Sequence, residues 1–163
     1  MLRVGFASRC ITPAPGKEIP GLFEKRLAQG TADDLFARAV VIDDGTQCVA
    51  LVQTDAIKVS EDVVAEARRP ARRLCGIPEK QCFIAATHTH SGGPIFGGFM
   101  SEGDPGYGPF VAEQIGAAIA EAHRLRRLAR VGTGADQARG VAFNRRFWMK
   151  DGTARTHPGK MNP

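Results

Sequence analysis

The chain has 163 residues, 43% of them hydrophobic and 24% charged, which is typical of a globular protein long enough to bury a core. We therefore expect one domain over residues 1–163. The net charge is only +5, and much of the positive charge lies in short arginine clusters on expected helices. No aromatic or recognition motif accompanies those clusters, which argues against a nucleic-acid partner.

Targeting and membrane signals are the next feature that the sequence can exclude. No apolar run approaches the roughly 18 residues that a membrane span needs. The first six residues are too short and too quickly polar for a secretory signal. The chain as given is therefore expected to be cytoplasmic, whereas a truncated N-terminus would leave secretion open.

The first half of the chain is expected to form three strands. Residues 2–8 predict the first strand, and residues 17–34 have no regular period, so we interpret them as a long excursion of the functional or mobile kind. Valine-rich runs at 35–42 and 47–53 flank an Asp-Gly turn. Because glycine supplies the positive φ of a tight turn, these two runs predict an antiparallel hairpin.

Helices and strands then alternate along the chain. A helix over about 60–75 has Ser60 as its N-cap, Pro70 as a site of kinking or division, and Gly76 at its end. Residues 82–87 predict a strand parallel to 47–53, since a helix connects the two. A second helix over 109–127 and a strand over 129–134 follow. The predicted fold class is α/β, a mixed β-sheet with flanking helices.

The chain is organised around the segment Thr87-His88-Thr89-His90, which ends an apolar run. If the strand continues through this segment, residues i and i+2 point to the same face, and both imidazoles project together. Neutral imidazole is the commonest protein ligand for metals near neutral pH. The alternative is a pair of surface or hydrogen-bonded loop histidines. The glycine-rich loop 91–108 that follows is either a ligand-approaching segment or lid, or a plain surface loop.

The order of motifs resembles the N-terminal region of the neutral/alkaline non-lysosomal ceramidases and their bacterial relatives. The resemblance covers nearly the whole chain, and its most specific part is Thr-His-Thr-His-Ser-Gly at 87–92. The motifs that carry it are Val4-Gly5, Ile11-Thr12-Pro13, Gly21, Leu35-Phe36-Ala37-Arg38-Ala39, Thr54-Asp55, Ala86 to Gly92, and Asn144-Arg145-Arg146.

Members of this family are zinc hydrolases that cleave the amide of ceramide into a fatty acid and sphingosine. The resemblance implies that His88 is a zinc ligand and that His90 lies beside the metal and assists the substrate or the developing charge. It implies that Arg145 faces the substrate site, and that the substrate is a small-molecule or lipid amide.

The sequence departs from the family in two respects. The second histidine is followed by Ser91-Gly92-Gly93-Pro94, where the family has Ser-Gly-Pro. The family's other zinc ligands, a second histidine, a glutamate and a tyrosine, come from downstream segments that this chain stops before. We therefore interpret residues 1–163 as the N-terminal portion of a larger ceramidase-like catalytic domain.

Two functions stay open at this point. One is a zinc-dependent hydrolase of linear amide bonds, or a piece of one, and the other is a non-catalytic module that binds a ligand or partner. A missing C-terminal segment or a homo-oligomer are the two sources left for the remaining ligands. Asp55 is either an orienting partner for an imidazole or a strand-end turn residue, and Arg145 is alternatively a surface arginine.

Overall fold

The computed structural model describes residues 1–98 and 100–156, and the chain divides into two compact units, Met1–Arg130 and Val131–Pro163. The expectation of one domain over the whole chain stays a prediction. Among the described residues, no helix is both long enough and apolar enough to cross a bilayer.

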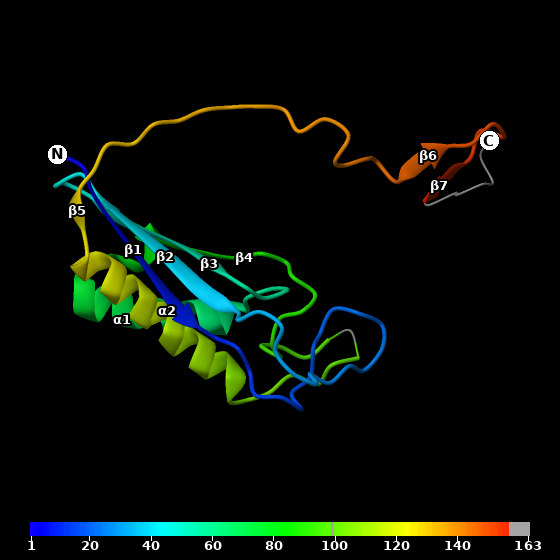
Figure 1. Ribbon diagram of the computed structural model, residues 1–163, viewed down its shortest axis with the longest axis horizontal. Coiled ribbons are helices and arrows are strands. Elements are labelled where there is room, and N and C mark those ends of the chain that lie inside the picture. The colour runs from blue at the N-terminus through cyan, green and yellow to red at the C-terminus, as the bar shows by residue number, and fades with distance from the viewer. Residues whose placement is uncertain (99, 157–163) are drawn as a thin grey trace. The chain divides into compact units, whose positions relative to one another are not determined.

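The first unit contains one sheet of five strands and two helices, which confirms the α/β prediction (Figure 1). In space the strands follow the order β4-β3-β2-β1-β5. Their bounds are Arg3–Cys10 for β1, Phe36–Asp43 for β2, Cys48–Thr54 for β3, Cys82–Ala86 for β4 and Arg127–Leu128 for β5. The helices are α1, Glu61–Cys75, and α2, Tyr107–Arg124, and a short 3-10 helix spans Glu79–Gln81.

The pairing of the strands makes the sheet mixed. β1 and β2 are antiparallel, β2 and β3 form the expected antiparallel hairpin, and β3 pairs with β4 in parallel. Gly45, in the hairpin turn, has φ +93°, as the Asp-Gly signal requires. The parallel pair confirms the crossover through α1 and brings the ends of β3 and β4 to the same edge of the sheet, just before the histidine segment.

Helix α1 agrees with the prediction in extent but differs from it in two details. It is one helix through Pro70, so the expected division is wrong; the proline ring lies against Gly116 of α2, where a Cβ would come within 2.9 Å of it. Ser60 makes no side-chain cap hydrogen bond. Its hydroxyl instead bonds to the carboxylate of Asp62, which lowers the pKa of that carboxyl. Gly76 ends the helix with φ +69°.

Both helices pack on one face of the sheet and bury a core of small and branched residues (Figure 1). The approach is close at Gly5 of β1, where a Cβ would lie 1.9 Å from the backbone oxygen of Ala122. Residues 129–134 do not form the expected strand. The Ala129 amide donates to the carbonyl of Leu2. Beyond that bond, this glycine-containing stretch pairs with no strand among the residues that the structure describes. The second unit contains a small hairpin of β6, Arg146–Trp148, and β7, Ala154–Thr156.

Candidate functional site

The histidine segment begins where β4 ends. The amide of Thr87 donates to the carbonyl of Thr54 at 3.0 Å, which extends the pairing with β3 by one residue. His88 then has φ +65°, in the left-handed region. The strand therefore does not continue through the histidine pair, and the alternation argument that placed both side chains on one face is wrong in its premise.

The two imidazoles nevertheless lie together. Their ring centroids are 5.1 Å apart and the ring planes meet at 80°, an edge-to-face contact. The turn at His88 brings the rings together. Both residues are exposed, so a ligand can reach them from solvent.

A hydrogen bond fixes the orientation and tautomer of His88. Its Nδ1 lies 2.8 Å from the carbonyl oxygen of Ile57, which follows β3. A carbonyl oxygen only accepts, so Nδ1 must carry the proton. In the neutral ring Nε2 then keeps its lone pair, which is the arrangement that orients a metal-binding histidine in proteins.

The excursion at residues 17–34 holds His90 in place. Gly21, with φ +121°, lies against the imidazole; a Cβ there would come 2.9 Å from Nδ1 of His90. Nη2 of Arg26 donates to the backbone carbonyl of His90 at 2.7 Å. Sequence reasoning missed Arg26, because nothing local marks an arginine whose partner lies 64 residues away.

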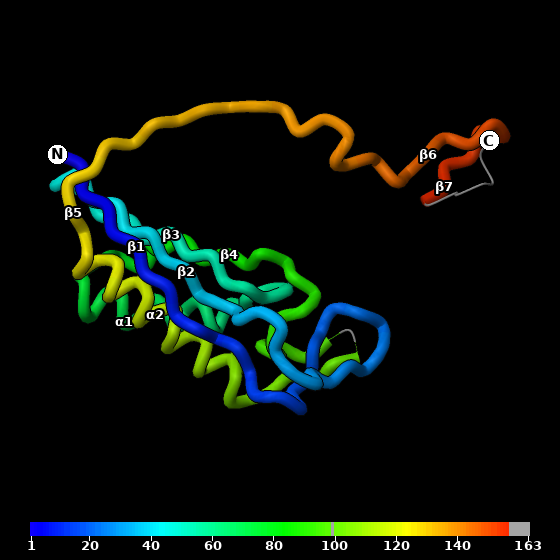
Figure 2. Tube along the Cα trace, in the orientation of Figure 1, coloured from blue at the N-terminus to red at the C-terminus, as the bar shows by residue number. Residues whose placement is uncertain are grey.

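Acidic and basic residues bind the excursion to the glycine-rich loop, and the two segments lie side by side at one end of the sheet (Figure 2). Glu18 accepts hydrogen bonds from the Ser101 hydroxyl at 2.8 Å and the Glu102 amide at 2.7 Å. Lys25 approaches Glu18 to 2.7 Å, and Lys17 pairs with Asp104. The Lys25 ammonium, followed by the two loop donors, lowers the pKa of Glu18 to about 2.

Packing explains the Gly92-Gly93 pair in residues 87–94, a stretch that we call the histidine loop. A Cβ on Gly92 would lie 2.9 Å from the Cα of Ala56, and one on Gly93 would lie 2.3 Å from Cζ of Tyr107. The Tyr107 ring is buried, its hydroxyl donates to the carbonyl of Ile11, and burial raises the pKa of the phenol. Both glycines therefore allow close packing of the histidine loop.

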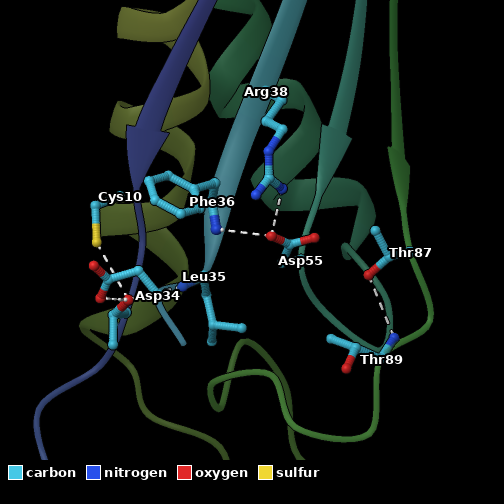
Figure 3. Close-up of polar contacts among 9 residues, drawn as sticks. Cys10, Asp34, Leu35, Phe36, Arg38, Asp55, Thr87 and Thr89 are labelled. Atoms are coloured by element: carbon cyan, nitrogen blue, oxygen red, sulfur yellow. Dashed lines mark hydrogen bonds and ion pairs between the residues drawn. The ribbon is translucent and has the colours of Figure 1, made fainter. Parts of the chain in front are cut away.

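Asp55 does not orient His88. Its Oδ2 accepts from the amide of Phe36 at 3.0 Å and from Nη1 of Arg38 at 2.6 Å (Figure 3). The hypothesis that it fixes this imidazole is wrong, since Ile57 occupies that position. Asp55 instead joins the end of β3 to the start of β2.

A cavity of about 400 Å³ lies between the histidine loop and the excursion. Thr89, Ser91 and Gly92 line it on the histidine side, and Asp33 and Asp34 are among the residues on the other. The side chain of Thr12 donates to Oδ1 of Asp34 at 2.9 Å and accepts from the amide of Leu35 at 2.9 Å, which holds this wall in place (Figure 3). The cavity gives a small polar group a place beside the histidine loop.

Metal donors are few in this arrangement. Within residues 1–98 and 100–156, no group of three or more His, Cys, Asp or Glu side chains is placed to hold a metal ion. His88 and His90 fit as imidazole donors, but a catalytic zinc site takes three protein ligands. Arg145 lies in the second unit, exposed, directly before β6, so its expected role toward the histidines stays a prediction.

Comparison with solved structures supports the fold. The chain is similar to the neutral ceramidase of Pseudomonas aeruginosa, with a TM-score of 0.66, 21% identity and coverage of 77% of this chain. A second structure, a ceramidase complexed with C2, matches with the same values. The match spans 22% of each of those longer chains. No family model and no curated protein matches the sequence. The chain thus has a ceramidase-like fold over the part that is matched.

Proposed function

We propose that this chain carries the histidine part of a ceramidase-like, zinc-dependent site that hydrolyses a lipid amide. The observation that supports the proposal best is the contact between Nδ1 of His88 and the carbonyl of Ile57. It leaves the lone pair of Nε2 available for a metal, on an exposed residue beside a second imidazole. The ceramidase-like fold supports the same chemistry and the same class of substrate.

His88, His90 and Arg145 would have separate roles toward the zinc ion and the amide. His88 would hold zinc through Nε2, and Ile57 would keep its tautomer fixed. When bound, zinc supplies a water with a pKa near 7 and polarises the amide carbonyl. His90, held through its backbone by Arg26 and against Gly21, would face the developing charge of the reacting amide. Arg145 is proposed as a further positive group on the substrate side.

A site with two imidazoles is incomplete for catalysis. We therefore expect residues 1–163 alone to bind zinc weakly and to hydrolyse amides poorly or not at all. A form extended by the downstream segment of a ceramidase-like domain should gain both zinc affinity and activity. The small number of donors also favours the second candidate function, a module that binds a ligand or partner without turnover.

The test measures zinc content and N-acyl amide hydrolysis on short and extended forms. His88→Ala in the extended form should abolish zinc binding and activity, whereas His90→Ala should mainly lower the rate. His123→Ala is the matched control, because His123 lies in the last turn of α2 and is not part of the histidine segment. Full zinc occupancy with turnover in the short chain would contradict the expected need for further ligands. An extended form that binds no zinc would favour the non-catalytic module.

A further inference from the structure

Residues 16–28, which include the first part of the excursion, form a short antiparallel hairpin that we call the arm. Backbone hydrogen bonds of 2.7, 2.8 and 3.0 Å join its two sides, from the amides of Gly16, Ala28 and Ile19 to the carbonyls of Ala28, Lys17 and Arg26 respectively. Between these bonds, Glu18 and Leu27 pair in an antiparallel bridge. Because the two sides are bonded to each other, an anchor on one side also limits the movement of the other.

Glu18 anchors the arm to the glycine-rich loop. Its Oε2 accepts from the hydroxyl of Ser101 at 2.8 Å and from the amide of Glu102 at 2.7 Å. Hydrogen bonds to a carboxylate are roughly twice as strong as those between neutral groups. Lys17 of the arm also pairs with Asp104 of the loop, but its side chain is half exposed, and such ion pairs contribute little. The Glu18 carboxylate is therefore the main polar joint between the two segments.

The glycine-rich loop is a fixed support for this joint. The amide of Asp104 donates to the carbonyl of Pro94 at 2.9 Å, which closes the loop on itself. At one end of the loop, Pro94 is fully buried and Ile95 packs in the core with 8% of its surface exposed. At the other end, the buried Tyr107 begins α2. The loop is thus held by the core on both sides of the joint.

The arm reaches the histidine loop through Arg26 and Gly21. Nη2 of Arg26 donates to the carbonyl of His90 at 2.7 Å, and a Cβ on Gly21 would lie 2.9 Å from Nδ1 of the same residue. On either side of His90, the amides of Thr89 and Ser91 bond to threonine hydroxyls two residues back, at 3.4 and 3.3 Å. Those bonds are long and local, whereas the Arg26 contact ties this backbone to a segment 64 residues away.

We propose that Glu18 is a positioning residue for His90 and acts through the arm and the guanidinium of Arg26. The contacts run from the glycine-rich loop to Glu18, across the bonded sides of the arm to Arg26, and on to the carbonyl of His90. Without the carboxylate the arm is free at its joint with the loop. Arg26 then no longer meets the carbonyl in one place, and the His90 ring leaves its contact with His88.

The consequence for chemistry rests on the proposed function, in which His90 faces the developing charge of the amide. A displacement of about 1 Å near a reacting group can cost about a hundredfold in rate, so an anchor that never touches the substrate still affects the reaction. The placement of His90 is a property of the fold and is measured without zinc.

Side-chain NMR of the histidines in the full 163-residue chain tests the placement, with a chelator present so that metal binding does not enter. The rings of His88 and His90, with centroids 5.1 Å apart, should give a nuclear Overhauser signal between their carbon-bound protons. Glu18→Ala should abolish this signal and shift the ring resonances of His90. The backbone amide spectrum of the sheet should stay that of the wild type, which shows that the fold persists.

The conservative variant Glu18→Gln should restore the signal. Its amide oxygen can accept from Ser101 and Glu102 as the carboxylate does, whereas its amide nitrogen cannot accept from Lys25, which lies 2.7 Å from Oε1 of Glu18. A loss in Glu18→Gln as complete as in Glu18→Ala overturns the proposed joint with the loop. Should Glu18→Ala fail to fold, Ser101→Ala removes one loop donor and should weaken the signal, and an unchanged signal would overturn the proposal.

Two further comparisons make the outcome decisive. Arg26→Ala should abolish the signal by itself, and in that background Glu18→Ala should shift the His90 resonances no further. Glu79→Ala is the matched control, because this carboxylate pairs with Arg72 at 3.7 Å before the start of β4, whereas the histidines follow its end. A signal that survives Glu18→Ala overturns the proposal. So does an effect that is equally large without Arg26 or is matched by Glu79→Ala.

Kinetics of the extended form connect the placement with the proposed reaction. Glu18→Ala should lower kcat by about tenfold or more at unchanged zinc content, and it should add nothing in a His90→Ala background. A variant that loses the Overhauser signal but keeps the wild-type kcat refutes the effect on the reaction. An extended form without any activity counts against the proposed function, while the NMR measurement on the metal-free chain still decides whether Glu18 positions His90.

Discussion

Gly93 provides the sharpest test of how the histidine loop is packed. A Cβ at this position would lie 2.3 to 2.4 Å from three atoms of Tyr107, far inside van der Waals contact. The ring cannot move aside easily, since Tyr107 is only 7% exposed and its hydroxyl is bound to the carbonyl of Ile11. The backbone of Gly93 does not adopt a left-handed φ, so the cost of Gly93→Ala is steric.

The magnitude follows from the two consequences of displacing the ring. Overpacking by one methyl group costs about 1–3 kcal/mol. Displacement also weakens the hydrogen bond to Ile11, which contributes about 1 kcal/mol. We therefore expect Gly93→Ala to lower the free energy of unfolding by about 2–4 kcal/mol in urea denaturation followed by circular dichroism.

A double-mutant cycle separates this cause from others. In a Tyr107→Ala background the new methyl group meets no ring, so Gly93→Ala should then cost less than about 0.5 kcal/mol. Gly30→Ala is the matched control, because no atom lies within 4 Å of a Cβ at that position. The reasoning fails if Gly93→Ala is as stable as wild type, or if its cost is the same with and without the Tyr107 ring.

The other predictions concern the contacts of the excursion and of Asp55. The pKa of Glu18 is lowered in the folded state, so the unfolded state binds more protons in acid; the stability from Glu18 is present above about pH 4.5 and is lost as the pH falls toward 2. Chemical denaturation between those two pH values should show a smaller loss of unfolding free energy in Glu18→Gln than in the wild type. The same pH dependence of stability in both proteins would contradict this. Arg26→Ala should lower stability by about 1 kcal/mol because the carbonyl of His90 loses a charged donor, and an unchanged denaturation midpoint would exclude that role. Asp55→Asn should leave the zinc affinity of the extended form unchanged in titration calorimetry, because the carbonyl of Ile57 orients His88. A weakened affinity would restore Asp55 as an orienting group.

Local signals made much of the fold predictable. Gly45 and Gly76 adopt positive φ where the turn and the helix end require it, and their identities alone indicated those conformations. The hairpin 36–54 and both helices were correctly predicted because each depends on neighbouring residues. The strand expected at 129–134 failed for the opposite reason. A strand needs a partner, and no local pattern shows that pairing with β1 stops at Leu128.

The candidate site was predictable in its residues but not in its geometry. The spacing of His88 and His90 correctly suggested neighbouring imidazoles, yet the turn at His88 was missed because a histidine in the left-handed region is uncommon. The contacts with Ile57, Arg26 and Gly21 depend on segments that meet only after folding. The roles of His88, His90 and Arg145 toward a metal or substrate stay predictions.

The contacts that close the histidine loop have a consequence for the order of folding. They join residues 31, 64, 83 and 96 positions apart, through Ile57, Arg26, Glu18 and Ile11 respectively. Closing such long loops costs conformational entropy before any contact offsets it, so these contacts are expected to form after the local hairpin and helices. A synthetic peptide spanning residues 82–94 contains both histidines but none of these partners. Its imidazoles should therefore sample many arrangements, and the paired geometry belongs to the folded sheet with its excursion in place.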